Sequence, residues 1–173
     1  MRLLVFSDNH RNREILKRII TAHPDAEQII SLGDSEMSEG ELTALSVFGV
    51  KGNYPFEPQF PSELNLTYAG IRFLFVHGHE DGVKTGLSRL IARARARQAD
   101  VVFYGHTHAL RIDDLGELLL VNPGALTFPR SGHGPTYAIV DVTGEVVEIT
   151  IMTAPAIVAV DRCRKTFGKE KRR

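Results

Sequence analysis

One stretch near the start of the chain decides the fold: Arg2-Leu3-Leu4-Val5-Phe6-Ser7-Asp8-Asn9-His10. Its apolar first half predicts a buried strand that ends at Phe6. Asp8 and His10 follow directly. Because residues two apart on a strand project to the same side, the spacing predicts that both side chains face one cation. The carboxyl edge of a strand layer is also where open α/β sheets place their ligands.

The next part of the chain repeats this order of apolar run and polar ligand. Apolar residues at helical spacing predict a helix over residues 13–22, and a shorter helix is predicted over 39–46. Strands are predicted at 28–32, which stops at Gly33-Asp34, and at 47–51, which stops at Gly52-Asn53. Strands that alternate with helices predict an α/β layer.

The second part of the chain continues with further strands. Residues 64–69 and 72–76 predict a hairpin that delivers His77, and residues 85–98 predict a helix with an outward row of Arg89, Arg93 and Arg97. A strand at 100–104 runs into Gly105-His106-Thr107-His108. Four later strands are expected to form an antiparallel sheet, at residues 110–113, 118–122, 136–142 and 146–153.

Length and composition predict one domain in a reducing, cytoplasmic setting. The chain has 173 residues, and its 21 Lys+Arg balance 21 Asp+Glu, so overall charge makes no case for nucleic acid or a membrane as partner. Its single cysteine, Cys163, cannot form an internal disulfide, and the chain begins with a strand pattern rather than a signal peptide. We expect the domain at residues 1–155 and a basic tail at 156–173, frayed over its last dozen residues.

Carboxylate, carboxamide and imidazole groups recur where the predicted strands end. The seven candidate metal ligands are Asp8, His10, Asp34, Asn53, His77, His106 and His108. With no thiolate among them, this set suits Mn, Fe, Zn or Ni better than an iron–sulfur cluster or a structural zinc site. Asp34 is the natural candidate for a carboxylate that bridges two cations. Two cations about 3.5–4 Å apart would share a water, lower its pKa and clamp phosphoryl oxygens, which fits phosphate-ester hydrolysis.

The ordered set Asp-x-His, Gly-Asp, Gly-Asn, His and Gly-His-x-His at residues 8–108 resembles the calcineurin-like metallophosphoesterase superfamily. The run Phe75-Val76-His77-Gly78-His79, the later Asn122-Pro123-Gly124 and the short chain resemble its compact bacterial and archaeal phosphodiesterase branch. The resemblance implies an α/β (α+β) fold like that of metallo-dependent phosphatases: a four-layer α/β/β/α sandwich of two mixed β-sheets with metals at one edge. It also implies two divalent metal ions, with Mn as the activating ion in vitro. The first would be held by Asp8, His10, Asp34 and His108, and the second by Asp34, Asn53, His77 and His106.

Three positions depart from the family pattern. Many members have a histidine and an acidic residue after Gly-Asn, and that histidine serves as a proton donor or stabilises the transition state. Here Tyr54 and Pro55 follow Asn53. Arg11 replaces a common glycine, and Ala125 replaces a common serine. No ligand is lost, but the usual general acid is missing.

Three other groups have two interpretations each. His79 is the candidate catalytic residue, because it could bind a phosphate oxygen or donate the leaving-group proton, but it could equally orient His77. Tyr54, Phe56 and Phe60 lie in a proline-rich loop at 54–61, where they either stack on a nucleobase or pack the loop down. The arginine row is either a solvated helix face or a set of phosphate contacts.

We therefore predict a metal-dependent phosphoesterase, more specifically a phosphodiesterase, that uses a hydroxide bridging two metal ions. The expected partner is a small phosphodiester or nucleotide-like substrate and not a membrane, and a homo-oligomer is compatible with the sequence. Nucleic acid is not indicated, since a nuclease for long polymers usually has a basic groove. The alternatives are a phosphomonoesterase or nuclease with the same site, or a non-catalytic protein-binding scaffold of the same fold. Scaffolds of this superfamily tend to lose ligands, whereas this chain keeps all seven.

Overall fold

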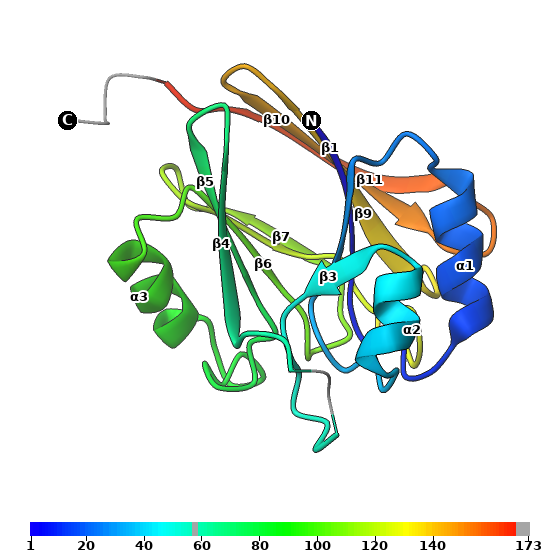
Figure 1. Ribbon diagram of the computed structural model, residues 1–173. Helices are drawn as coiled ribbons and strands as arrows, with labels where there is room; N and C mark the ends of the chain where they lie inside the picture. The colour runs from blue at the N-terminus through cyan, green and yellow to red at the C-terminus, as the bar shows by residue number, and fades with distance from the viewer. Residues whose placement is uncertain (57–58, 169–173) are drawn as a thin grey trace.

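Two β-sheets pack face to face in the computed structural model, which describes residues 1–56 and 59–168. Helices α1 (Arg13–Ala22) and α2 (Glu39–Ala44) cover the outer face of one sheet, and α3 (Ser88–Ala96) covers the outer face of the other (Figure 1). The four-layer α/β/β/α sandwich of two mixed sheets is therefore confirmed. No helix in this described part of the chain is long and apolar enough to cross a membrane.

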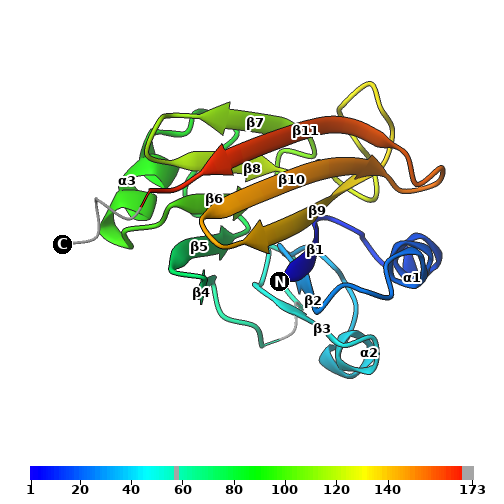
Figure 2. The same cartoon turned by 90° about the horizontal axis from the view of Figure 1, so that it is seen from above.

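The first sheet joins strands from both ends of the chain. Its strands are β1 (Arg2–Phe6), β2 (Gln28–Ser31), β3 (Val47–Gly49), β9 (Thr136–Thr143), β10 (Val146–Thr153) and β11 (Ala159–Thr166). Their order across the sheet is β11-β10-β9-β1-β2-β3 (Figure 2). The pairs β1–β2 and β2–β3 are parallel, whereas β9, β10 and β11 add to β1 in antiparallel fashion.

The second sheet is built from the middle of the chain. Its strands are β4 (Glu63–Tyr68), β5 (Ile71–Val76), β6 (Val101–Tyr104), β7 (Arg111–Asp114) and β8 (Leu119–Asn122), in the order β4-β5-β6-β8-β7. The predicted hairpin is present as β4 and β5. The interior strands β5, β6 and β8 are parallel, and the two edge strands are antiparallel to their neighbours.

The prediction that the later strands form an antiparallel sheet of their own is wrong. β7 and β8 join the second sheet beside β6, whereas β9 and β10 extend the first sheet beyond β1. Burial explains the placement of β8, because every residue of Leu119–Asn122 is buried. A strand buried on both faces belongs in the interior of a covered sheet, where parallel pairing is common.

Strand β1 contributes to two of the three layers of the hydrophobic core. Successive strand residues point to opposite faces, so Leu3 and Val5 pack between the sheets. Leu4 and Phe6 pack under α1 together with Leu16. All are fully buried, and burial of such side chains contributes about 1.5–3 kcal/mol each. The strand that precedes the first candidate ligands is thus fixed from both sides.

The prediction of a frayed C-terminal tail is wrong for residues 162–166, which belong to β11 and pair with β10. The alternation that identifies a strand is hidden in the sequence by long basic side chains. Cys163 is half-buried, Phe167 is 8% exposed, and between them Lys165 lies over the Phe167 ring while its ammonium pairs with Asp114. A lysine can bury its carbon chain in this way and keep its charge in contact with a partner. The remaining part of the predicted tail, residues 169–173, lies outside the described residues.

Candidate metal centre

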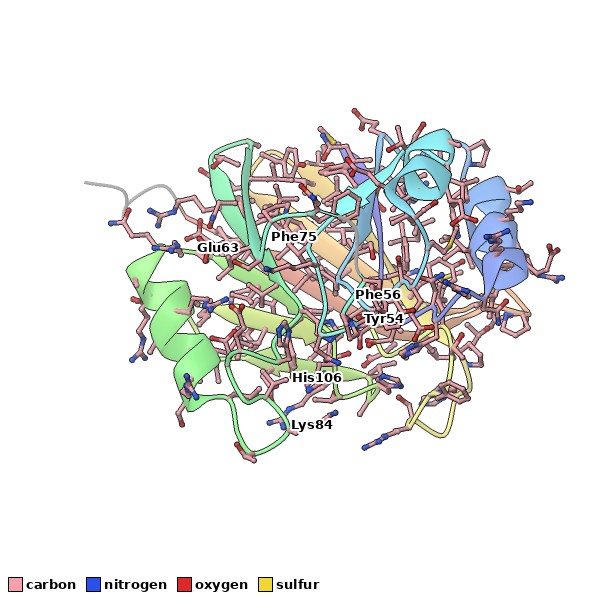
Figure 3. The ribbon with its side chains drawn as sticks, turned by 60° about the horizontal axis from the view of Figure 1, so that its bottom comes forward. Tyr54, Phe56, Glu63, Phe75, Lys84 and His106 are labelled. Atoms are coloured by element: carbon pink, nitrogen blue, oxygen red, sulfur yellow. The ribbon has the colours of Figure 1, made fainter. Side chains whose placement is uncertain are left out.

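The carboxyl ends of β1, β2, β3, β5 and β6 meet at one edge of the sandwich, the lower edge in Figure 1. This follows from the parallel pairing within each sheet. The loops that leave these strand ends contain all seven candidate ligands. Figure 3, with this edge brought forward, shows His106, Tyr54 and Lys84 on it, each from a different loop. Residues far apart in the sequence are thus brought together.

Five of the candidate ligands lie on left-handed backbone: Asp8, His10, Asp34, His106 and His108 have φ values of 54°, 40°, 48°, 67° and 58°. The predicted reason for the proximity of Asp8 and His10, strand alternation, is therefore wrong, because the backbone at both residues is left-handed and not extended. Backbone hydrogen bonds hold the loop instead: Asp8 N donates to Gly33 O at 3.1 Å, and His10 N donates to Asp34 O at 3.2 Å. Non-glycine residues on such backbone cost about 1–3 kcal/mol each and concentrate at functional sites.

The first cluster consists of Asp8, His10 and His108, whose potential ligand atoms all lie within 4.8 Å of one another. His108 Nε2 is 3.2 Å from Asp8 Oδ1. The Nδ1 atom of each histidine contacts an oxygen outside the cluster: Glu36 Oε1 at 2.7 Å from His10, and the Phe128 carbonyl at 3.0 Å from His108. A histidine held through Nδ1 turns its Nε2 atom toward the centre of the cluster, as in metal sites.

The second cluster consists of Asp34, Asn53, His77 and His106. The potential ligand atoms of Asp34, His77 and His106 lie within 4.8 Å of one another. His77 Nε2 is 3.2 Å from Asn53 Oδ1 and 3.5 Å from Asp34 Oδ2, while His77 Nδ1 contacts the Leu32 carbonyl at 2.8 Å. Asp34 Oδ1 accepts hydrogen bonds from the backbone N–H groups of Asn53 and Tyr54, at 2.8 and 3.0 Å. This cluster is therefore tied together by its own members.

The two buried aspartates are held in their charged form. Burial alone raises the pKa of Asp8, but contact with His108, the charge of His77 and the Ser7 hydroxyl outweigh it, so the pKa is lowered. Burial likewise raises the pKa of Asp34, and the hydrogen bond and charge of His77, with two backbone N–H groups, reverse the effect and lower the pKa. Ionised carboxylates are the form that binds a cation.

The histidines differ in protonation. Burial and the charge of His77 lower the pKa of His106 to about 4, which keeps His106 neutral. Burial also lowers the pKa of His77, but contact with Asp34 and the charge of Asp8 overcome it and raise the pKa. Contact with Asp8 raises the pKa of His108 against the effect of burial. In both clusters a proton on imidazole and a divalent cation therefore compete for the same atoms.

Buried polar atoms without partners show that these residues fit metal ions. Within the described chain, His10 Nε2 is buried without a hydrogen bond, and Asp8 Oδ1 lacks hydrogen-bond geometry although His108 Nε2 is 3.2 Å away. An unsatisfied buried polar atom costs about 1–3 kcal/mol. A divalent cation between carboxylate oxygen and imidazole nitrogen would satisfy both atoms. The distances group Asp34 with the second cluster, so its role as a bridge stays a prediction.

His79 lies between the second cluster and a cavity of about 700 Å³ that it helps to line. Its ring centroid is 5.2 Å from that of His77 and 6.1 Å from that of His106. Both ring nitrogens of His77 contact other groups, the Leu32 carbonyl and Asn53 Oδ1, so His79 does not orient His77 by a hydrogen bond. Burial and the charge of His77 lower the pKa of His79.

The loop after β3 forms much of the cavity wall, through Tyr54, Pro55 and Phe60. Its aromatic residues have different surroundings. Phe60 packs against the core under the first sheet, whereas Phe56 is 81% exposed and contacts the Tyr54 ring edge-on at 5.8 Å. One of the three thus packs the loop down, and the other two stand at the rim. Residues 57 and 58 of this loop lie outside the described part of the chain.

Two residues of the arginine row on α3, Arg93 and Arg97, make ion pairs within the protein, which neither predicted interpretation included. Arg93 lies 3.2 Å from both Glu80 and Asp81, in the turn that follows His79, and Arg97 lies 2.5 Å from Glu63 on β4. Arg93 thereby fastens the turn that contains His79 to α3.

Sequence reasoning missed two residues that position the clusters. Glu36 orients His10, and a carboxylate two residues after Asp34 was a signal that could have been used. Asn122 was noted only as part of a motif. Its side-chain amide donates to the Gly105 carbonyl and to Thr107 Oγ1, both at 3.0 Å, and so holds the loop that contains His106 and His108.

Two mixed sheets between helices, with paired imidazole–carboxylate clusters where the parallel strands end, define a metal-dependent phosphoester hydrolase. The chain belongs to the calcineurin-like phosphoesterase superfamily, whose domain model matches residues 1–145. The resemblance found in the sequence is thereby confirmed.

Comparison with individual proteins agrees. The chain is 34% identical over 151 residues to the probable metallophosphoesterase YsnB of Bacillus subtilis, which covers 86% of this chain and 89% of YsnB. It is 26% identical over 186 residues to the phosphodiesterase YfcE of Escherichia coli, which covers 92% and 96%. A predicted phosphoesterase from Streptococcus pneumoniae has a TM-score of 0.82 at 22% identity over 96% of this chain and 97% of the other. Vps29 from Entamoeba histolytica, complexed with zinc, has a TM-score of 0.74 at 20% identity over 97% and 100%. At such identities these two structures show the shared fold alone.

Proposed function

We propose that this protein is a phosphodiesterase that works with two divalent cations, with Mn as the activating ion in vitro. The main support is the pair of clusters, in which ionised carboxylates and inward-facing imidazole nitrogens converge at one edge. The residues that would hold the cations are Asp8, His10 and His108 for the first, Asn53, His77 and His106 for the second, and Asp34 for both. When bound, two such cations polarise the phosphoryl oxygens and activate a water for in-line attack.

The contribution of the chain is to hold these groups ready before substrate arrives. Three histidine rings are oriented through Nδ1, by Glu36, by the Phe128 carbonyl and by the Leu32 carbonyl. The ligand-bearing loops are fixed by backbone hydrogen bonds on strained, left-handed backbone. Charges that are already in place need no reorganisation during the reaction, which is the main source of electrostatic catalysis.

His79 is the residue that we propose beside the leaving group. Hydrolysis adds the oxygen of water to phosphorus and breaks the bond to one ester oxygen, which must leave with a proton or a strong hydrogen bond. Tyr54 stands where many relatives have a histidine for this purpose. His79 lies next to His77 and His106 and lines the adjoining cavity, so its ring can reach a departing oxygen there.

The cavity next to the second cluster supports an organic phosphate ester as the substrate. Its volume of about 700 Å³ leaves room for an organic group beyond the phosphate. YfcE, to which the chain is similar, is named a phosphodiesterase. A phosphomonoester also has one organic group that this cavity could receive, so the likeness to YfcE is what favours the diester.

Hydrolysis of two aryl phosphates by metal-stripped protein tests the proposal. We expect turnover of bis(4-nitrophenyl) phosphate that depends on added Mn, exceeds turnover of 4-nitrophenyl phosphate, and is lost in Asp8→Asn. Faster hydrolysis of the monoester would replace the diesterase by a phosphomonoesterase. Absence of metal-dependent, Asp8-dependent hydrolysis of either compound would reject the enzyme and favour the protein-binding scaffold.

A further inference from the structure

Phe128 is an exposed aromatic residue in the loop after β8. It is 72% exposed, so its ring adds little to the core. Its φ of 52° places it in the left-handed region, which favours glycine and is costly for a bulky side chain. Both features count against phenylalanine on grounds of stability. Conformational outliers that the fold does not need are a reason to look for a function.

The loop around Phe128 is fastened to the first cluster on two sides. Thr127 N donates to the Asp8 carbonyl at 3.0 Å, and Arg130 N donates to the His108 carbonyl at 2.8 Å. The Phe128 carbonyl accepts from His108 Nδ1 at 3.0 Å. The loop therefore holds residue 128 at a fixed place relative to the candidate ligands.

The backbone contact does not explain the aromatic ring. Any residue, glycine included, could present the same carbonyl to His108. The ring itself lies beside His10, with centroids 5.8 Å apart and planes tilted by 53°. An exposed aromatic surface is thus placed next to the first cluster, whereas His79 and the large cavity lie next to the second.

We propose that Phe128 is a specificity-determining residue. Its ring binds a planar aromatic group, such as a nucleobase, that belongs to the ester group remaining on phosphorus after hydrolysis. This rests on the proposed phosphodiesterase function and names its substrate class. The leaving group and the retained ester are different substituents of phosphorus, so they need two different binding places. One such place lies next to each cluster. His79 and the cavity receive the leaving group, and Phe128 receives the retained group. Aromatic side chains bind every nucleobase through its face, largely independently of its identity.

The variant Phe128→Gly tests this, because glycine removes the ring and relieves the left-handed backbone together. The two substrates share 4-nitrophenolate as leaving group and differ in the retained ester: thymidine 5′-(4-nitrophenyl phosphate) and methyl 4-nitrophenyl phosphate. We expect the ratio of kcat/KM for the thymidine ester to that for the methyl ester to fall about tenfold. The melting temperature should not fall, because the strain is relieved.

The matched control is Ala69→Gly, which relieves the same kind of strain, at φ 50°, in the turn between β4 and β5. It should leave the substrate ratio unchanged. An unchanged ratio of kcat/KM in Phe128→Gly would overturn the proposal. If activity on both substrates falls equally, the ring only supports His10.

A binding measurement separates failure of this inference from failure of the proposed function. Calorimetry on the Mn-loaded protein should show that Phe128→Gly weakens binding of thymidine 5′-monophosphate about tenfold relative to inorganic phosphate. If wild-type protein hydrolyses neither ester, the proposed function is rejected and this comparison still decides the role of Phe128. Equal weakening of both ligands, or of neither, would refute the aromatic platform.

Discussion

The first cluster lies on left-handed backbone throughout, and its two histidines are oriented from outside by Glu36 and the Phe128 carbonyl. In the second cluster His77 is the central contact, and it joins Asn53 and Asp34 directly. Both clusters have an internal contact and an outside one, but the first has two histidines oriented from outside, whereas the second has His77 in contact with two other members of the cluster.

The difference indicates how each cluster responds to a cation. In the first cluster, a cation would satisfy buried atoms of Asp8 and His10 that have no hydrogen bond within the described chain. In the second cluster, a cation must replace two contacts of His77 Nε2, with Asn53 and Asp34, whereas in the first it replaces the one contact of His108 Nε2 with Asp8. Because fewer existing contacts are lost in the first cluster and buried atoms without a hydrogen bond are satisfied there, we expect the first cluster to bind its ion more tightly.

The largest expected effect comes from Asp34→Asn, which tests whether the clusters act as one unit. If Asp34 serves both cations, its loss should lower kcat/KM for the diester about 10³-fold or more, since several kcal/mol of charge stabilisation disappear. Elemental analysis should show weaker binding of both ions. Asp8→Asn is the comparison and should lose only the ion of the first cluster. Retention of two ions by Asp34→Asn would contradict a shared carboxylate.

An intermediate effect is expected from Glu36→Gln, which tests the outside support of the first cluster. Glu36 contacts His10 Nδ1 at 2.7 Å, and glutamine removes its carboxylate charge; mutation of such a partner typically weakens metal binding about 10–100-fold. Metal titration by calorimetry should show the change at one of two sites. The matched control is Leu32→Met, which keeps the carbonyl that orients His77 and should leave both affinities unchanged. Equal weakening of both sites in Glu36→Gln would remove the distinction between the clusters.

The smallest effect concerns two glycines that approach the clusters closely. A Cβ on Gly52 would overlap the backbone N and the Oδ1 atom of Asp34, whereas one on Gly105 would overlap mainly the Ser7 hydroxyl. A side chain can move more easily than backbone, so Gly52→Ala should destabilise the fold by about 1 kcal/mol more than Gly105→Ala. Denaturant unfolding measures the difference.

The control for this pair is Gly40→Ala in α2, where a Cβ meets nothing within 4 Å. This change should stabilise the protein by about 0.5–1 kcal/mol, because alanine favours helix. If Gly52→Ala and Gly105→Ala lower the free energy of unfolding equally, the backbone of the Asp34 loop moves as easily as the Ser7 side chain.

Local patterns in the sequence predict the first helix and the hairpin well. The helix over residues 13–22 is confirmed at Arg13–Ala22, because its apolar spacing is clear and Asn12 caps its first turn. The hairpin around Gly70 is confirmed for the same reason, since both strands and their turn lie within a short segment. By contrast, α3 begins at Ser88 instead of residue 85. Its N-cap, Leu87, makes no side-chain capping bond, so the sequence contains no start signal there.

Features that depend on distant contacts could not be predicted. The pairing of β9 with β1 joins the two ends of the chain, and no local pattern specifies it. The two-residue spacing of Asp8 and His10 predicted that their side chains lie together, but it assumed an extended backbone. Their backbone is left-handed, and at non-glycine residues surrounding loops fix that conformation. The sequence did not predict that Phe128 lies near the candidate ligands, because only the fold of its loop brings the ring beside His10.

Strand β11 is the last strand of the first sheet in the described chain, so one of its sides offers unpaired backbone groups. Such an edge can add a strand from another molecule and start aggregation. Arg162 and Arg164 are exposed along this strand, and like charges on a second copy would repel them. The basic composition that suggests a solvated tail in the sequence thus belongs to the open edge of a sheet, where its charge disfavours pairing with the same strand of a second copy.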